Sequence, residues 1–462
     1  MHRYPTVAEV TEAARRLVSR FPGACRLRRI GTSRAGRPIP MLSVGHGPRH
    51  VLVVARPHPD EPVGGATALA LAERAAAGDR HSPATDPDTV TWDIVLCLDP
   101  DGAALSEGIE AATAGPDPAL ARYYRAAFRP VAAEQPEWAP IVGRRLPESR
   151  ALFAVIDELR PALQCSLHNV DAGGTWVQLT GDLPGLATPY ATSASALDIP
   201  VQHGTYDALY WENPAPGVHV LPPPDSTARL AAGSENIALS TWCAPQRYGG
   251  VTAIVEVPLW ATAPADDRTP HPDPARALRD LSALVREGGR QVTAVFDKAR
   301  GFLPPAEHSP PRRVLEWMAD DLYDLVADAW QPLADQAHSA PGSPALTTAG
   351  ISALEVVARR QPLRAAGLLL RLLDAADDPA SAALHHELDG LFTTWCTDFE
   401  QSLRLRPVPV HAQVELQTRT VLAAAECALG HTVTADVAPR TAHARRSPRG
   451  RIPPARPSGP TG

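Results

Sequence analysis

The chain has 462 residues, too many for one ordinary hydrophobic core, so two folded domains are expected. Its 44% hydrophobic and 21% charged residues are typical of a soluble globular protein, and its formal net charge of −7 argues against general nucleic-acid binding. The N-terminus lacks the apolar stretch of a signal peptide, and no run approaches the roughly 18 apolar residues of a membrane span. We therefore expect a cytoplasmic protein without a membrane partner, and the oligomeric state stays open.

The first 300 residues alternate between expected helices and strands. A capping box, Thr6 with Glu9, opens an amphipathic helix that ends near Phe21. The further expected elements are a hairpin of 27–30 and 39–44, strands at 51–55, 94–98, 162–167 and 251–257, and helices at 64–77, 152–159 and 275–300. Because the strands are apolar on both faces, they predict an α/β fold with a mixed, largely parallel sheet flanked by helices.

The pattern changes after a proline-rich stretch at residues 303–313. Beyond it, apolar residues recur at helical spacing only, and the last residues are rich in Arg and Pro but poor in apolar side chains. We expect an α/β domain over 1–303, an all-α domain of unknown role over 312–435, and a disordered tail over 439–462.

Three side chains at expected strand ends have the chemistry of a metal site. His58 and Glu61 follow the strand 51–55, and His168 follows the strand 162–167. In a parallel sheet the ligand site lies beyond the carboxyl ends of the strands, which brings these residues to one edge. A His-x-x-Glu motif alone occurs by chance about 0.7 times in such a chain. Two imidazoles and a carboxylate at one edge, however, are a ligand set typical of catalytic zinc.

Glu256 lies within the apolar run 253–257. A buried carboxylate costs free energy unless it is paired or functional. Its functional interpretation is a general base, and its structural interpretation is a buried salt bridge to an arginine.

Two polar segments have open interpretations. The sequence Asp-Pro-Asp-Gly at 99–102 is good turn chemistry, and the alternative is that it supports a zinc-binding histidine from behind. The segment 134–138 either faces the cleft or, as its composition favours, forms a solvated loop.

Together these motifs resemble the zinc metallocarboxypeptidase family, which has the carboxypeptidase A-like fold. The stretch 30–39 is similar to that family's N-terminal hairpin, and Asp-Pro-Asp-Gly at 99–102 is similar to its Asn-Pro-Asp-Gly turn. The resemblance covers about residues 4–300. It implies a zinc carboxypeptidase-like catalytic domain with one Zn²⁺ per chain, held by His58, Glu61 and His168. It also implies that Glu256 activates water.

The chain departs from this family in its arginines. The family has an arginine that stabilises the oxyanion and an Asn-Arg pair that holds the substrate's C-terminal carboxylate. Here none of the three asparagines precedes an arginine. Arg129 is the candidate substrate-binding residue, and its rivals are Arg122, Arg125 and Arg144.

The resulting hypothesis is a zinc metallopeptidase that cleaves a peptide bond, with Glu256 taking a proton from water and passing it to the leaving amine. One alternative is a zinc deacylase of small N-acyl amino acids, which a closed pocket sized for one residue would indicate. The other is a binding module that keeps the fold without turnover.

Overall fold

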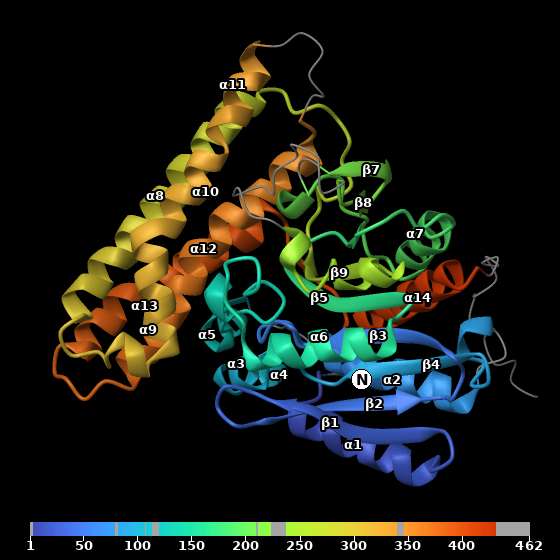
Figure 1. Ribbon diagram of the computed structural model, residues 1–462. Helices are drawn as coiled ribbons and strands as arrows, with labels where there is room; N and C mark the ends of the chain where they lie inside the picture. Colours follow the sequence, from blue (N-terminus) through green and yellow to red (C-terminus); the bar gives the residue numbers. More distant parts are fainter. Residues whose placement is uncertain are drawn as a thin grey trace, which may run out of the picture.

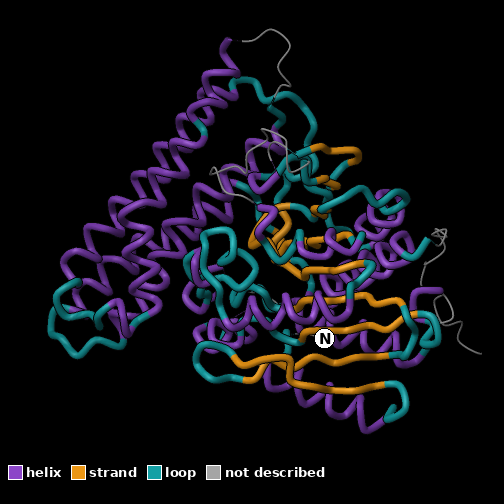
Figure 2. The backbone as a smooth tube through the Cα atoms, viewed as in Figure 1, coloured by secondary structure: helices purple, strands orange, loops and turns teal. Residues whose placement is uncertain are grey.

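The computed structural model describes residues 3–78, 82–106, 108–112, 120–208, 211–222, 237–339 and 346–430 (Figures 1 and 2). The expected tail over 439–462 lies outside these ranges. Within them, none of the helices combines the length and the apolar character that a membrane span needs.

A mixed sheet forms the centre of the molecule (Figure 2). Its described strands have the order β1-β2-β4-β3-β5-β9-β6-β8-β7, and β10 pairs with β9. The strands are β1 (Cys25–Thr32), β2 (Pro38–Val44), β3 (Arg49–Ala55), β4 (Val90–Val95), β5 (Leu163–Gly173), β6 (Trp176–Leu179), β7 (Glu212–Ala215), β8 (Val218–Val220), β9 (Val251–Ala261) and β10 (Arg406–Pro407). The central strands β4, β3, β5 and β9 are parallel, whereas β1 with β2 and β6 with β9 are antiparallel.

Three expected strand ends were placed wrongly, and one of them is the strand expected at 251–257, which is β9 and continues to Ala261. The strand expected at 94–98 is β4, which ends at Val95. The strand expected at 162–167 is β5, which continues through His168 to Gly173 because β9 pairs with it over this whole length. His168 nevertheless lies at an open edge, since β3 ends at Ala55, opposite Leu167.

Helices cover both faces of the sheet (Figure 1). One face packs against α1 (Val7–Arg20), α2 (Val63–Ala77), α7 (Ala187–Ala196) and α14 (Val410–Ala428) in one apolar core. The other face packs against α6 (Pro147–Leu159). The capping box expected at Thr6 is present at the start of α1. These layers follow from strands that are apolar on both sides.

Further helices form a bundle beside the sheet (Figure 1). They are α5 (Leu120–Ala126), α8 (Pro274–Ala299), α9 (Pro310–Trp317), α10 (Tyr323–Ala329), α11 (Gln331–Ser339), α12 (Thr348–Asp374) and α13 (Ser381–Ser402), with a π-helical turn (Met318–Leu322) between α9 and α10. The predicted fold class is confirmed: a mixed sheet with flanking helices is followed by a helical C-terminal part.

Each of the two expected domains contributes a helix that packs against the other domain. Helix α8, from the first expected domain, packs against α10, α11 and α12, and helix α14, from the second, packs against α2 and β9. The division into 1–303 and 312–435 remains a prediction.

Candidate metal centre

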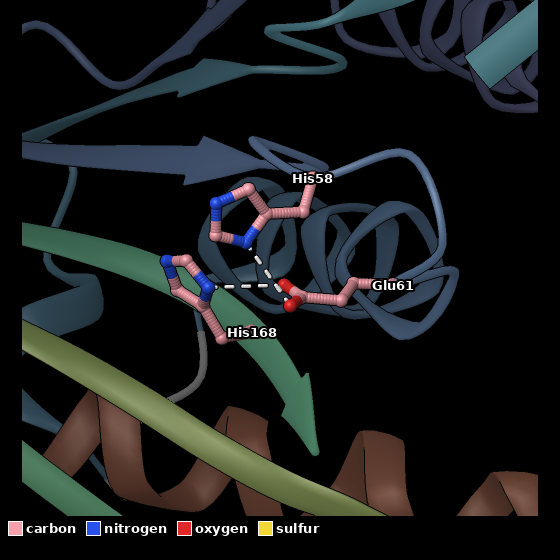
Figure 3. Close-up of side chains that lie close together, drawn as sticks. All are labelled: His58, Glu61 and His168. Carbon is pink, nitrogen blue, oxygen red and sulfur yellow. Dashed lines mark hydrogen bonds and ion pairs between the residues drawn. The ribbon is translucent and has the colours of Figure 1, made fainter. Parts of the chain in front are cut away.

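The three expected ligands converge at the open edge of the sheet (Figure 3). His58 and Glu61 come from the loop between β3 and α2, and His168 comes from β5. The Nδ1 atoms of His58 and His168 lie 3.0 and 2.9 Å from the two carboxylate oxygens of Glu61. The three candidate ligand atoms all lie within 4.8 Å of one another. One divalent cation can therefore reach all three.

Arg56 shapes the loop that carries His58 and Glu61. Its φ of 49° places it in the left-handed region, which turns the chain sharply away from the end of β3. Its buried guanidinium donates to the carbonyl of Pro59 at 3.2 and 3.3 Å and pairs with Glu110 at 2.8 Å. These contacts hold the loop in a conformation that few non-glycine residues adopt.

Asn169 connects this loop to the sheet. Its Oδ1 accepts from the backbone N–H of Val63, the first residue of α2, at 3.1 Å. Its Nδ2 donates to the carbonyl of Val257 in β9 at 2.9 Å. Asn169 thus links β5 and β9 to the helix that follows the ligand loop, a role that the sequence did not indicate.

Glu137 supports His168 from behind, so the solvated loop favoured for residues 134–138 is wrong at this position. Glu137 is only 1% exposed, and its Oε2 lies 3.1 Å from Nε2 of His168. It also accepts from Ser166 Oγ at 2.7 Å and from Trp242 Nε1 at 2.8 Å. A carboxylate at Nε2 leaves Nδ1 as the atom that faces Glu61, which fixes the ring for metal binding through Nδ1.

Glu256 lies directly across from His168 in the parallel register of β5 and β9. Its Oε1 is 3.9 Å from His168 Nδ1, so its carboxylate faces the candidate centre without displacing Glu61. The structural alternative was a buried salt bridge between Glu256 and an arginine, and among the described residues Glu256 forms no such ion pair. Burial, opposed by His168 and reinforced by Glu61, raises the pKa of Glu256 to about 8.

The other charged groups shift one another as a buried cluster. Burial alone would raise the pKa of Glu61, but His58, Arg129 and His168 hold it well below its usual value. Burial would likewise lower the pKa of His168, but Glu61 and Glu137 raise it well above its usual value. The pKa of His58 is lowered, first by burial and then by Arg129. The cluster thus keeps Glu61 ionised, the form that binds a cation.

Arg129 lies beside the centre. Its Nε is 2.8 Å from Asp60 and its Nη2 is 2.5 Å from Glu61. Of the four arginines considered from the sequence, it is the one among the described cavity-lining residues. Arg125 instead pairs with Asp389, and Arg144 is exposed.

The segment 99–102 has a structural role as a turn and helix cap, the first of the two interpretations drawn from the sequence. Asp99 accepts from the N–H of Gly102 and caps the short helix α3 (Pro100–Leu105). Asp101 accepts from Ser33 Oγ at 2.7 Å and from Arg37 at 3.0 Å, which ties the turn of the β1–β2 hairpin to α3.

A cavity of about 360 Å³ opens over the centre. His58, Glu61, His168 and Glu256 line one part of it. Five aromatic side chains also line it: Trp138, Trp176, Tyr206, Trp211 and Trp242. Its size is that of a small-molecule site rather than of a long peptide groove.

The donor set fits zinc. Two neutral imidazole nitrogens and one carboxylate are a usual protein ligand set for catalytic zinc and leave a coordination position free for water or substrate. The carboxylate behind His168 is the kind of partner that such a ligand needs.

Residues 10–127 match the zinc carboxypeptidase family, which confirms the resemblance seen in the sequence. The chain is similar to a metallo-carboxypeptidase from Burkholderia cenocepacia at 18% identity and a TM-score of 0.34, covering 54% of this chain and 58% of that one. It is similar to carboxypeptidase A from Helicoverpa armigera at 16% identity and a TM-score of 0.35, covering 55% and 65%. The matched part thus spans somewhat more than half the length of these proteins. No curated protein matches the sequence.

Proposed function

From the family match over residues 10–127, we propose that this chain is a zinc-dependent hydrolase that cleaves a peptide bond, at the C-terminal residue of its substrate. The observation that carries the proposal is the meeting of His58, Glu61 and His168 with Glu256 directly across from His168. The first three would hold one Zn²⁺ per chain, and the fourth would be the general base.

The chain's own residues would divide the chemistry as follows. Zinc, when bound, supplies a Lewis acid that polarises the scissile carbonyl and lowers the pKa of water. Glu256 takes a proton from the attacking water and returns it to the leaving amine nitrogen. Arg129, which lines the cavity beside Glu61, stabilises negative charge on the carbonyl oxygen. Glu137 keeps the ring of His168 in place throughout.

A paired substitution tests this proposal. Glu256→Gln should retain zinc and the fold but reduce the rate on peptide substrates by roughly 10²–10⁴-fold, because only the proton transfer is lost. His168→Ala should lose both zinc and activity, because it removes a ligand. Elemental analysis and a peptide hydrolysis assay measure the two effects. Equal zinc in His168→Ala and wild type would exclude the ligand assignment, and zinc loss in Glu256→Gln would make that residue a ligand.

The cavity favours one further candidate. Its modest volume, together with the helical wall that α9 and α10 place over it, suits a single acylated amino acid, so a zinc deacylase is the second candidate function. Comparing N-acyl amino acids with peptides of four or more residues separates the two, since a deacylase will hydrolyse only the former. A binding module without turnover is excluded if purified, zinc-loaded protein hydrolyses either class.

A further inference from the structure

Strand β6 and a 3₁₀ turn (Tyr206–Ala208) bring one acidic and several aromatic side chains to the cavity over the metal centre. Strand β6 contributes Trp176 and Gln178, and the turn with the residues after it contributes Tyr206, Asp207 and Trp211. The proposed division of the chemistry uses none of these side chains. Their position and charge bear on which substrate the cavity accepts.

Asp207 lies beside the strand that faces the general base. In the antiparallel pair of β6 and β9, Trp176 is directly opposite Glu256, so the two side chains project from the same face of the sheet. Gln178, two residues further, shares the face of Trp176, and its Nε2 donates to the backbone carbonyl of Asp207 at 3.3 Å. In agreement with this placement, burial, Glu61 and Asp207 together raise the pKa of Glu256.

The carboxylate of Asp207 has no partner in the described part of the chain. The backbone carbonyl of this residue accepts from Gln178, but its side chain forms no ion pair or hydrogen bond with the described residues. Asp207 is exposed, so water solvates its charge while the cavity is open. A ligand that displaces this water must replace its hydrogen bonds, and a cationic donor does so best.

The arginines that line the cavity do not supply this cation. Each of them pairs with other carboxylates: Arg129 with Asp60 and Glu61, Arg360 with Asp171, and Arg364 with Asp60 and Asp171. The carboxylate of Asp207 is therefore free to bind a positive group on a ligand.

Aromatic side chains near Asp207 favour the same kind of ligand. Trp211 follows it by four residues, and the backbone N–H of Trp211 donates to the carbonyl of Ala208 at 3.1 Å, which keeps the chain close to the turn. Trp176 and Trp211 both line the cavity. A cation against the face of an indole ring gains about 0.5–2 kcal/mol. A carboxylate together with indole rings is a typical environment for an ammonium group.

The neighbourhood of Glu256 indicates which ammonium group fits. In the proposed reaction Glu256 activates the water that attacks the scissile carbonyl, so groups beside Glu256 lie near that carbonyl. The α-ammonium of an N-terminal residue is one carbon away from the carbonyl of the same residue. The side-chain ammonium of a lysine is several carbons further away. The cavity volume of about 360 Å³ also suits a short substrate.

We propose that Asp207 binds the free α-ammonium group of the residue whose carbonyl is attacked, with the indole rings of Trp176 and Trp211 beside that group. The substrate class is then a dipeptide, or another aminoacyl amide, with a free N-terminus. This inference deepens the proposed hydrolase function and rests on it.

Matched substrates test the proposal on the full-length, zinc-supplemented protein. L-Alanyl-L-phenylalanine and propionyl-L-phenylalanine share their carbon skeleton and scissile bond, and only the first has an α-ammonium group. We expect kcat/KM to be at least about 10-fold higher for the dipeptide, and equal values overturn the proposal. Propionyl-L-lysine has an ammonium group only on its side chain. If it reacts as well as the dipeptide, the site reads a side chain and the proposal is wrong.

Variants of Asp207 separate binding from the intrinsic reactivity of the substrates. Asp207→Asn removes the charge but keeps the backbone carbonyl that accepts from Gln178, so the turn should survive. The ratio of kcat/KM for the dipeptide to that for propionyl-L-phenylalanine should fall about 10-fold. Taking the ratio cancels effects on Glu256, which both substrates need. Asp207→Glu keeps the charge and should restore part of the ratio.

Asp266→Asn is the matched control. Asp266 is also exposed, but it is not among the residues that line this cavity, so the variant should keep the wild-type ratio. A wild-type ratio in Asp207→Asn, or an equal fall in Asp266→Asn, overturns the role of Asp207.

A binding measurement separates this inference from the proposed function. In zinc-supplemented Glu256→Gln, in which turnover is slowed, isothermal titration calorimetry should show the dipeptide binding at least about 10-fold more tightly than propionyl-L-phenylalanine. Adding Asp207→Asn should remove the difference. A protein that hydrolyses both ligands alike overturns the role of Asp207, while the hydrolase function stands. A protein that hydrolyses neither, yet binds the dipeptide through Asp207, overturns the hydrolase function and leaves the ammonium site intact.

Discussion

At the scale of single residues, substituting Glu137 tests whether a carboxylate hydrogen-bonded to His168 strengthens metal binding. Its carboxylate contacts Nε2 of His168 and should orient Nδ1 toward the cation. Glu137→Gln should weaken zinc binding about 10–100-fold, because an amide is a poorer acceptor for the imidazole N–H. Competition with a chelator of known affinity measures the change.

The control for this prediction lies in the same segment. Glu134 pairs with Arg313 on the bundle and does not contact the ligands. Glu134→Gln should therefore bind zinc as wild type does. A similar loss in both variants would show that the segment acts through its fold and not through His168.

Asp99 gives a pH-dependent prediction. It is fully buried, its Oδ2 has no hydrogen-bond partner among the described residues, and burial raises its pKa to about 7. The unfolded chain ionises this group near its ordinary pKa of about 3.9. Between these values the folded state binds more protons, so Asp99 makes the protein less stable as pH rises from about 4 to about 7.

Asp99→Asn should remove this dependence while keeping an acceptor for the N–H of Gly102. The difference in unfolding free energy between the variant and wild type should therefore be larger at pH 8 than at pH 5, by about 1–3 kcal/mol in favour of the variant. Denaturant unfolding at the two pH values measures it. Asp280→Asn, on the exposed side of α8, is the control and should show no such trend. A parallel shift at both pH values would contradict the ionisation of Asp99.

At the scale of elements, helix α14 stabilises the strands that carry the site. Gln417 is fully buried and donates to the carbonyls of His168 and Val255, both at 3.0 Å. Gln413, one turn earlier, accepts from the hydroxyl of Tyr4 at 2.6 Å. The last described helix thus contacts β5 and β9 where His168 and Glu256 lie.

Gln417→Leu should cost about 1–3 kcal/mol of unfolding free energy, because two buried carbonyls lose their partner. Thermal or denaturant unfolding measures the loss. The matched Gln401→Leu, at an exposed position on α13, should change little. If the two variants are equally stable, the contacts of Gln417 contribute nothing.

At the scale of the whole molecule, the sheet needs the C-terminal helices. Helix α14 packs into the same apolar core as α1, α2 and the central strands. The apolar core of the helical bundle likewise includes Tyr4, Val63 and Trp260 from the N-terminal part of the chain. A chain that ends at residue 303 would expose both surfaces to water, at roughly 25 cal/mol per Å². We expect the fragment 1–303 to show no cooperative thermal transition, whereas 1–430 should melt as the full chain does. Circular dichroism distinguishes the two, and a cooperative transition in 1–303 would instead support an autonomous first domain.

The sequence alone predicted the central strands and the identity of the candidate ligands. Apolar runs of the right length predicted the central strands, and polar residues just after those runs marked His58 and Glu61, because strand ends deliver side chains to one edge. His168 was found although its strand continues beyond it, since any long apolar run that contains one histidine draws attention to it. Glu256 stood out for the same reason, as a carboxylate among Ile254, Val255 and Val257.

The tertiary structure alone decided which distant residues complete the site. Glu137 lies in a polar segment whose burial depends on Ser166 and Trp242, and Gln417, which donates to the carbonyl of His168, lies more than 240 residues after it. No local pattern records such contacts, because a buried charge is tolerated only where partners from elsewhere in the chain compensate it. The periodicity of apolar residues in the sequence predicts which side chains lie on the same face of a helix or strand. Which element packs against that face is decided by the tertiary packing of the helices and the sheet.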